Sequence, residues 1–343
     1  MGADQSAWLG GDAAVAQCKC RIVIVGPKIW ESALLALATH LPPDARIIAT
    51  GSSLEELMRD DLFCEGNVLL NVSGTSQTLP SIIDEMPHLT WIHSINCGVD
   101  NIMCPEIADS DIVLTNAKGV FSSNLAEYAL FACSYFAKDL PRLRRQQAER
   151  QWEKYYVGQL RGATMGIVGY GDIGAACARL AKAYGMRVLA LRRNPDLCSG
   201  DANVDQAFGA HELGAVMSQA DYLIVCMALT PHTRQMIREE HFKASKKGLV
   251  LVNIGRGALL DEEALIRALQ SGDVAGAALD VFAVEPLPEE SPLWALPNVL
   301  VSPHTADLTP TSRYASVQLF TENCARFLRG QELGCVVDKN VGY

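Results

Sequence analysis

The chain has 343 residues, of which 49% are apolar, and a formal net charge of −10. This length can support a large core and would ordinarily divide into two domains, while the acidic balance argues against nucleic acid or anionic membrane as a general partner. No apolar run is long enough to cross a bilayer, and residues 1–20 have no signal or transit pattern. We therefore expect a cytoplasmic protein with a loose N-terminal leader over residues 1–20.

The eleven cysteines are scattered through apolar segments such as those that hold Cys133, Cys177 and Cys226. In a chain without a secretory signal, they are expected to be reduced, buried thiols. Cys18 and Cys20 are close together, but nothing near them supplies the remaining ligands of a zinc site. No metal is therefore predicted.

From residue 21 onward, short apolar segments alternate with amphipathic ones. The first such unit has expected strands at 21–26, 45–50, 67–73, 89–95 and 111–116, and expected helices at 31–41, 53–60 and 79–89. Alternation of this kind predicts a parallel sheet with helices on its faces. The unit contains no G-x-G-x-x-G sequence, so it is expected to present a substrate rather than a nucleotide.

The strand at 89–95 runs into a glycine turn. Successive backbone N–H groups at Cys97, Gly98 and Val99 can form an anion nest that holds a carboxylate. A plain turn ahead of Asp100 explains the local sequence equally well.

A second α/β unit follows two helical segments at 122–140 and 142–152. Its expected strands are 165–168, 187–191, 222–228, 248–254, 275–281 and 298–303, and a last helix is expected at 310–330. The strand at 165–168 enters Gly169, Tyr170, Gly171, Asp172, Ile173 and Gly174, and a small-residue helix follows. In a dinucleotide-binding turn, the first glycine allows the tight turn, the second lets the backbone approach a pyrophosphate, and the third lets helix and strand pack closely. An ordinary tight strand-to-helix turn is the alternative.

The fold class predicted is therefore α/β, with two Rossmann-like or flavodoxin-like doubly wound parallel-sheet domains and a cleft between them. The end of the strand at 187–191 bears on the cofactor, because NAD enzymes usually place an acid there. Here Arg192 and Arg193 follow, and no carboxylate comes before Asp196. Guanidinium groups suit a 2′-phosphate, so NADP(H) is favoured over NAD(H). The alternative is a pair of solvated arginines with loosely bound NAD.

Three reactive side chains follow strands of the second unit, where ligands bind in open α/β sheets: Arg256, Glu285 and His304. Arg256 would hold a 2-keto acid by its carboxylate. His304 would protonate the carbonyl oxygen while hydride arrives from the nicotinamide, and Glu285 would orient the imidazole and raise its pKa. Taken singly, each residue has another explanation: Arg256 as one half of an interdomain ion pair, Glu285 as a loop acid, and His304 as a structural histidine.

Two further residues have positions that suit cofactor contacts. Asp280, at the end of its strand, suits the nicotinamide carboxamide, and Thr230 is placed to meet the cofactor from another strand.

Around these candidate residues, the sequence resembles the D-isomer-specific 2-hydroxyacid dehydrogenase family. The matching stretches are GVDNI, NLAEYAL, GIVGYGDIG, LVNIGRGALLDEEAL, ALDVFAVEPLPEESPLW, NVLVSPHTA and VDKNVGY. The resemblance implies Arg256, Glu285 and His304 as catalytic residues, and the backbone at Gly98 and Val99, beside Cys97, as a cradle for the substrate carboxylate. It further implies that Ile254, Gly255, Asp280, His304 and Ala306 surround the nicotinamide half of the cofactor. Beside Thr230, we also expect cofactor contacts at Ala228, Leu229 and Arg256.

The resemblance also implies how the chain divides and assembles. A discontinuous substrate domain would comprise 21–118 and 308–343, and an NAD(P)-binding domain would comprise 119–307. A homodimer would form through the nucleotide domains.

The chain departs from the family pattern at three places. Asn96 and Cys97 replace small residues that often precede Gly-Val-Asp, and Ala228 replaces a common proline. Arg192 replaces the expected acid, as in NADPH-preferring glyoxylate and hydroxypyruvate reductases. The leading hypothesis is therefore NADPH-dependent reduction of a small 2-keto acid.

Other members of the family supply the alternative hypotheses. A 3-phosphoglycerate-dehydrogenase-type enzyme would use NAD and need more basic residues near the turn at 97–102, where only Lys118 is within reach. A nucleotide-sensing corepressor with little turnover can keep the same three residues. Formate dehydrogenases, which carry glutamine in place of Glu285, are disfavoured.

Overall fold

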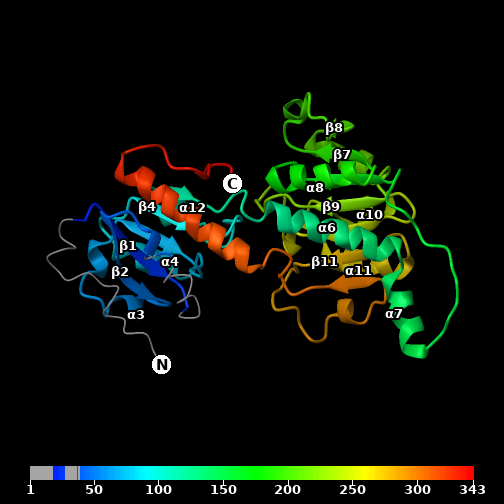
Figure 1. Cartoon of the computed structure of the whole chain (residues 1–343), viewed down its shortest axis with the longest axis horizontal. Coiled ribbons are helices and arrows are strands. Elements are labelled where there is room, and N and C mark those ends of the chain that lie inside the picture. Colours follow the sequence, from blue (N-terminus) through cyan, green and yellow to red (C-terminus); the bar gives the residue numbers. More distant parts are fainter. Residues whose placement is uncertain (1–17, 28–36, 38) are drawn as a thin grey trace. The chain divides into compact units, whose positions relative to one another are not determined.

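The computed structural model describes residues 18–27, 37 and 39–343. By its internal contacts the chain divides into two compact units, Met1–Val120 with Thr309–Tyr343, and Phe121–Leu308 (Figure 1). Most of the expected leader and most of the helix expected at 31–41 lie outside the described residues. In the part of the chain that is described, no helix is both long and apolar enough to span a membrane.

The first unit is built on a five-stranded sheet in which every pairing is parallel, in the order β2-β1-β3-β4-β5. The strands are β1 (Cys20–Val25), β2 (Ala45–Gly51), β3 (Val68–Asn71), β4 (Trp91–Ser94) and β5 (Val113–Thr115). This is the flavodoxin-like order. Strands β3 and β4 are buried along their whole length, as expected for a parallel sheet covered on both faces.

Helices cover both faces of this sheet. Since successive strand residues point to opposite sides, the residues of β1 contribute alternately to two separate cores. The short helices are α3 (Leu54–Leu57), η3 (Phe63–Glu65), α4 (Leu79–Asp84) and α5 (Pro105–Ala108). They share one core with Val23 and Val25, whereas Ile22 and Ile24 pack with Phe320 in a second core. Phe320 belongs to α12 (Pro310–Leu328), so the end of the chain completes the first unit (Figure 1).

The second unit contains seven parallel strands in the order β12-β11-β10-β9-β6-β7-β8. The strands are β6 (Thr164–Val168), β7 (Arg187–Leu191), β8 (Gln206–Phe208), β9 (Tyr222–Val225), β10 (Val250–Asn253), β11 (Gly276–Leu279) and β12 (Val299–Val301). The order reverses between β6 and β9, which is the switch point where a doubly wound sheet binds its ligand.

Two layers of helices enclose this second sheet. One layer is formed by α6 (Ser122–Ala137) and α8 (Asp172–Ala183), and the other by α9 (Leu213–Met217), α10 (Glu239–Lys243) and α11 (Glu262–Ser271) (Figure 1). The remaining elements are α7 (Leu140–Glu149), η4 (Pro195–Cys198), η5 (Ala210–Glu212), η6 (Gly257–Leu259) and η7 (Pro292–Trp294).

The predicted fold class of two doubly wound α/β units is thus confirmed. Strand β7 spans the predicted residues, and every other predicted strand has an observed counterpart. Strand β8 was not predicted, because its three residues Gln-Ala-Phe at the sheet edge carry no apolar run.

Candidate active site

The glycine turn after β6 is shaped by close backbone packing. Gly169 has φ 103°, and a Cβ there would lie 2.5 Å from the backbone of Met227. A Cβ on Gly174 would lie 2.5 Å from the carbonyl oxygen of Gly169, whereas one on Gly171 would meet no atom within 4 Å. Gly171 is also the N-cap of α8, and no side chain caps the helix there. The turn therefore leaves open space at a helix N-terminus, which fits a dinucleotide pyrophosphate.

The same turn is bonded to the end of β7. The N–H groups of Gly169 and Tyr170 both donate to the carbonyl of Leu191, at 3.0 and 3.2 Å. Arg192 follows Leu191 directly, and its own N–H donates to Phe208 of β8. The predicted arginine pair therefore begins directly after the residue to which the glycine turn is hydrogen-bonded. The side chain of Tyr170 is buried, with its hydroxyl donating to Asp201, so only the backbone of Tyr170 can contribute to a cofactor site.

The loop after β10 is held by Asn253, a fully buried polar residue. Its side-chain amide donates to the carbonyl of Arg256 at 2.9 Å and accepts from the N–H of Gly255 at 3.1 Å. Nη1 of Arg256 donates to the carbonyl of Gly255 at 2.8 Å. These bonds close a tight turn that fixes the base of the arginine side chain.

Glu285 and His304 form the hydrogen-bonded pair that the sequence predicts. Oε2 of Glu285 lies 2.8 Å from Nδ1 of His304, and Oε1 accepts from the N–H of Phe282 at 3.0 Å. Nδ1 is thereby engaged, so Nε2 is the ring nitrogen that remains for other partners. A carboxylate in this position makes the imidazole a better base and fixes its orientation.

The electrostatics of the pair favour a charged imidazolium. The hydrogen bond to Glu285 raises the pKa of His304, although burial and the charge of Arg256 act in the opposite direction. Burial also acts to raise the pKa of Glu285, but the hydrogen bonds from His304 and from the Phe282 N–H outweigh it and leave this pKa lowered. The charge of Arg256 acts on both groups, so the three predicted side chains share one electrostatic site.

Asp280 holds the loop that carries His304. The buried carboxylate accepts from the Ser302 hydroxyl at 2.6 Å and from the N–H groups of Thr305 and Ala306 at 3.0 and 3.2 Å. The Asp280 carbonyl also accepts from the N–H of His304 at 2.9 Å. The contact between Asp280 and the nicotinamide stays a prediction, and the loop contacts are a role that the sequence did not indicate.

The family follows from comparison with known proteins. Residues 130–306 match the family model described as D-isomer specific 2-hydroxyacid dehydrogenase, NAD binding domain. The chain belongs to this enzyme family. The glyoxylate reductase of Pyrococcus furiosus is 34% identical over 271 residues, which cover 76% of this chain and 79% of that protein. The D-3-phosphoglycerate dehydrogenase of Methanocaldococcus jannaschii is 32% identical over 83% of this chain, which spans about half of that protein (53%).

Solved structures of D-isomer specific 2-hydroxyacid dehydrogenases have the same fold. One from Xanthobacter autotrophicus, in complex with NADPH and MES, is 28% identical, with a TM-score of 0.80 over 94% of this chain and 99% of that chain. The NADPH-dependent glyoxylate/hydroxypyruvate reductase of Sinorhizobium meliloti, in complex with NADP and sulfate, is 25% identical, with a TM-score of 0.78 over 95% of this chain and 100% of that chain.

Ile254 follows β10 directly, and the other predicted ligand-binding residues lie in two places. Ala228, Leu229 and Thr230 follow β9 in a half-buried loop, where Thr233 accepts from the N–H of Thr230 and donates to the carbonyl of Ala228, both at 2.8 Å. Cys97, Gly98 and Val99 follow β4 in the first unit, where the amide of Asn116 donates to the carbonyl of Cys97. Both groups lie beyond the carboxyl ends of strands.

Sequence reasoning missed several residues that build this site. Asn253, Ser302 and Tyr128 act on the loops rather than on a ligand. A buried asparagine at the end of an apolar strand was a usable signal, because a buried amide needs partners. Tyr128 gave no such signal, since its partner lies 174 residues away.

Proposed function

We propose that this enzyme reduces a small 2-keto acid, such as glyoxylate or hydroxypyruvate, to the D-2-hydroxy acid with NADPH. The observation that carries the proposal is the hydrogen-bonded pair of Glu285 and His304 at 2.8 Å, on both of which the charge of Arg256 acts. An imidazolium is a proton donor, and a guanidinium beside it binds a carboxylate without giving up its charge.

Each residue has a distinct part in this reaction. Arg256 binds the carboxylate of the keto acid through its planar fork. His304, protonated on Nε2, donates that proton to the carbonyl oxygen, and in the reverse direction it takes the proton from the hydroxyl. Glu285 keeps the ring oriented and its proton available. The reduced nicotinamide, when bound, supplies the hydride. Cys97, Gly98 and Val99 remain predicted donors to the substrate carboxylate.

The preference for NADP(H) rests on Arg192 and Arg193. They come directly after Leu191 of β7, whose carbonyl accepts hydrogen bonds from the glycine turn. The carboxylate that NAD enzymes usually have at this position is replaced by arginine. Guanidinium groups pair with a phosphate, whereas the ribose hydroxyls of NAD require an acceptor. The relatives from X. autotrophicus and S. meliloti, which contain NADPH and NADP, are consistent with this preference.

A substrate and cofactor screen on the purified protein tests the proposal. Oxidation of NADPH and of NADH is followed with glyoxylate, hydroxypyruvate, pyruvate and 3-phosphohydroxypyruvate. We expect the highest kcat/KM with NADPH and a small unphosphorylated acid. A preference for 3-phosphohydroxypyruvate with NADH would support the phosphoglycerate dehydrogenase alternative. Absence of turnover with every pair would favour a sensor or corepressor.

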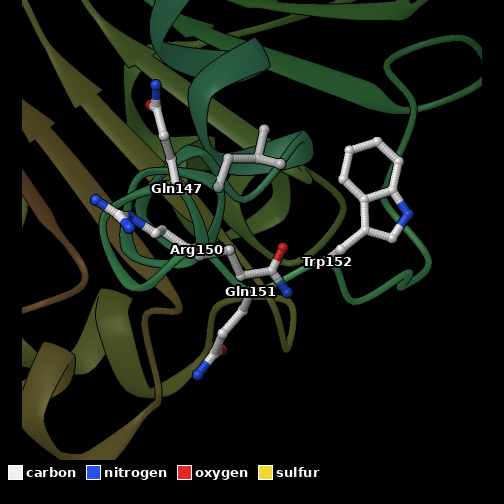
Figure 2. A pocket seen from close by; sticks show the side chains of 6 residues that line it. Gln147, Arg150, Gln151 and Trp152 are labelled. Carbon is white, nitrogen blue, oxygen red and sulfur yellow. The ribbon is translucent and has the colours of Figure 1, made fainter.

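We further propose a homodimer that uses the surface around α7. Trp152 and Tyr156, in the segment after α7, are 95% and 104% exposed in the single chain. A cavity of about 390 Å³ is lined by Leu143, Gln146, Gln147, Arg150, Gln151 and Trp152. Figure 2 shows the indole of Trp152 at one side of this cavity, with Gln147 and Arg150 at the other. Large exposed aromatic side chains of this kind mark protein contacts.

The cysteines support a cytoplasmic location. All eleven are free thiols, seven of them buried. Reduced thiols persist in compartments that keep glutathione and thioredoxin reduced.

A further inference from the structure

The backbone of His304 has an uncommon conformation. Its φ is 51°, in the left-handed region that a residue with a Cβ rarely adopts. Such a conformation persists only where surrounding contacts fix it, and it is found preferentially at functional sites. The contacts that hold this loop therefore also determine where the imidazole points.

Most of these contacts converge on Asp280. Its carboxylate accepts from two backbone N–H groups of the loop, those of Thr305 and Ala306, and from the hydroxyl of Ser302. Its carbonyl accepts from the N–H of His304. A carboxylate whose partners are all donors stays fixed only while each donor stays in place.

Ser302 is the one side-chain donor in this group, and it has a second partner. Its Oγ lies 2.6 Å from the hydroxyl oxygen of Tyr128, which belongs to α6. A serine has a single hydroxyl proton, and Ser302 donates that proton to Asp280, so the Tyr128 hydroxyl is the donor in the other bond. Burial raises the pKa of Tyr128, which keeps it protonated for this role.

We propose that Tyr128 is a positioning residue for proton transfer, because its hydroxyl, through Ser302 and Asp280, fixes the strained loop that carries His304. This inference rests on the proposed function of His304 as the proton donor. It gives α6, through the tyrosine of the stretch NLAEYAL, a part in catalysis that Arg256, Glu285 and His304 do not account for. Tyr128, Ser302, Asp280 and His304 all lie within the second unit.

Substitution of Tyr128 by phenylalanine tests the inference, because it removes only the hydroxyl. The loss of one hydrogen bond from the chain is expected to speed hydrogen exchange at the backbone amides of residues 304–306 about three- to tenfold. The kcat for keto-acid reduction is expected to fall by a similar factor, with KM and the Kd of NADPH nearly unchanged. Tyr135→Phe is the matched control, since it removes a hydroxyl from the same helix, where the Tyr135 ring contacts Phe131 and Phe136.

Ser302 supplies the second arm of the experiment. Ser302→Ala should reproduce both effects, and Ser302→Thr, which keeps a hydroxyl, should restore normal exchange and kcat. In the Ser302→Ala background, Tyr128→Phe should have no further effect, because Tyr128 reaches Asp280 through the hydrogen bond to Ser302.

Three results would overturn the inference. They are unchanged exchange in Tyr128→Phe, faster exchange with unchanged kcat, and additive effects of the two substitutions. If the unsubstituted enzyme reduces no keto acid, the proposed function fails, while the exchange measurement still shows whether Tyr128 holds the loop.

Discussion

Gly257 and Phe282 are packed so closely that a Cβ on Gly257 would lie 1.9 Å from the carbonyl carbon of Phe282. Gly257 follows Arg256, and the N–H of Phe282 donates to Glu285. The absence of a side chain at this one position therefore brings the arginine loop against the loop that carries the carboxylate. Only a glycine fits there, because the atoms that a side chain would meet belong to the backbone.

Gly257→Ala is expected to separate these two loops. The overlap with backbone atoms should destabilise the folded enzyme by about 2 kcal/mol or more, as overpacking does, and keto-acid reduction should be largely lost. Thermal unfolding and a kinetic assay measure the two effects. Gly214→Ala is the control, because a Cβ on Gly214, in α9, meets no atom within 4 Å. Equal stability of the two variants would contradict the packing argument.

Glu285→Gln is expected to change the pH dependence of reduction. The carboxylate raises the pKa of His304, while burial and Arg256 lower it, so removal of the charge lowers this pKa. Reduction requires the protonated ring and is lost as pH rises through the pKa of His304. The alkaline limb of the kcat/KM profile should therefore move to lower pH. The amide of glutamine keeps an acceptor for the Phe282 N–H, so an unshifted limb in a folded variant would remove Glu285 from this role.

His304→Gln should abolish the proton donor while leaving cofactor binding in place. We expect kcat to fall about 10²- to 10⁴-fold, the range that general acid catalysis supplies. The Kd of NADPH, measured by fluorescence quenching, should change little. A variant that keeps a substantial fraction of the original kcat would show that another group donates the proton.

Removal of both arginines after β7 should reduce selectivity for NADPH. In Arg192→Ser/Arg193→Ser, the loss of charged hydrogen bonds to a 2′-phosphate should weaken NADPH at least about tenfold, with a much smaller effect on NADH. Arg187→Ser, at the other end of the same strand, controls for a general change in charge, because the Arg187 guanidinium donates to the side chains of Gln206 and Gln219, away from the glycine turn. Equal weakening of the two cofactors would refute the assignment.

Trp152→Asp should weaken the proposed dimer. A charge placed on an exposed aromatic contact opposes burial of that contact, so the molar mass in solution should shift toward that of one chain, 37.1 kDa. Light scattering coupled to size exclusion gives this mass directly. Trp294→Asp serves as the control, since Trp294 is also exposed, at 54%, but lies in η7. A single-chain mass for the unsubstituted protein would disprove the dimer.

The sequence predicts the elements whose signals are local. Strand β7 and the glycine turn are examples, because an apolar run and three spaced glycines define them within a few residues. The pair of Glu285 and His304 was also predictable as a hypothesis, since both follow neighbouring strands of one sheet. Parallel strands end at the same edge, so their loops lie close together.

The parts that the sequence did not reveal depend on distant contacts. The left-handed backbone of His304 is set by partners outside its own segment, among them Asp280. The requirement for glycine at position 257 arises from Phe282, 25 residues later, and Tyr128 meets Ser302 across 174 residues. Local residue patterns carry no information on such pairings. These distant pairings determine how the loops of the site are held. The reacting groups themselves are recognisable in the sequence as polar residues after apolar strands.

The return of α12 to the first unit has a consequence for how the protein is made. Phe320 of α12 stacks on Trp91 of β4 with ring centroids 5.3 Å apart, and Val317 and Cys324 are buried with them. During synthesis, the strands of the first unit therefore emerge well before the helix that fills its interior. The unit that ends at Leu308 has all of its strands earlier. A truncation before Pro310 would consequently leave the first unit, rather than the second, without part of its interior.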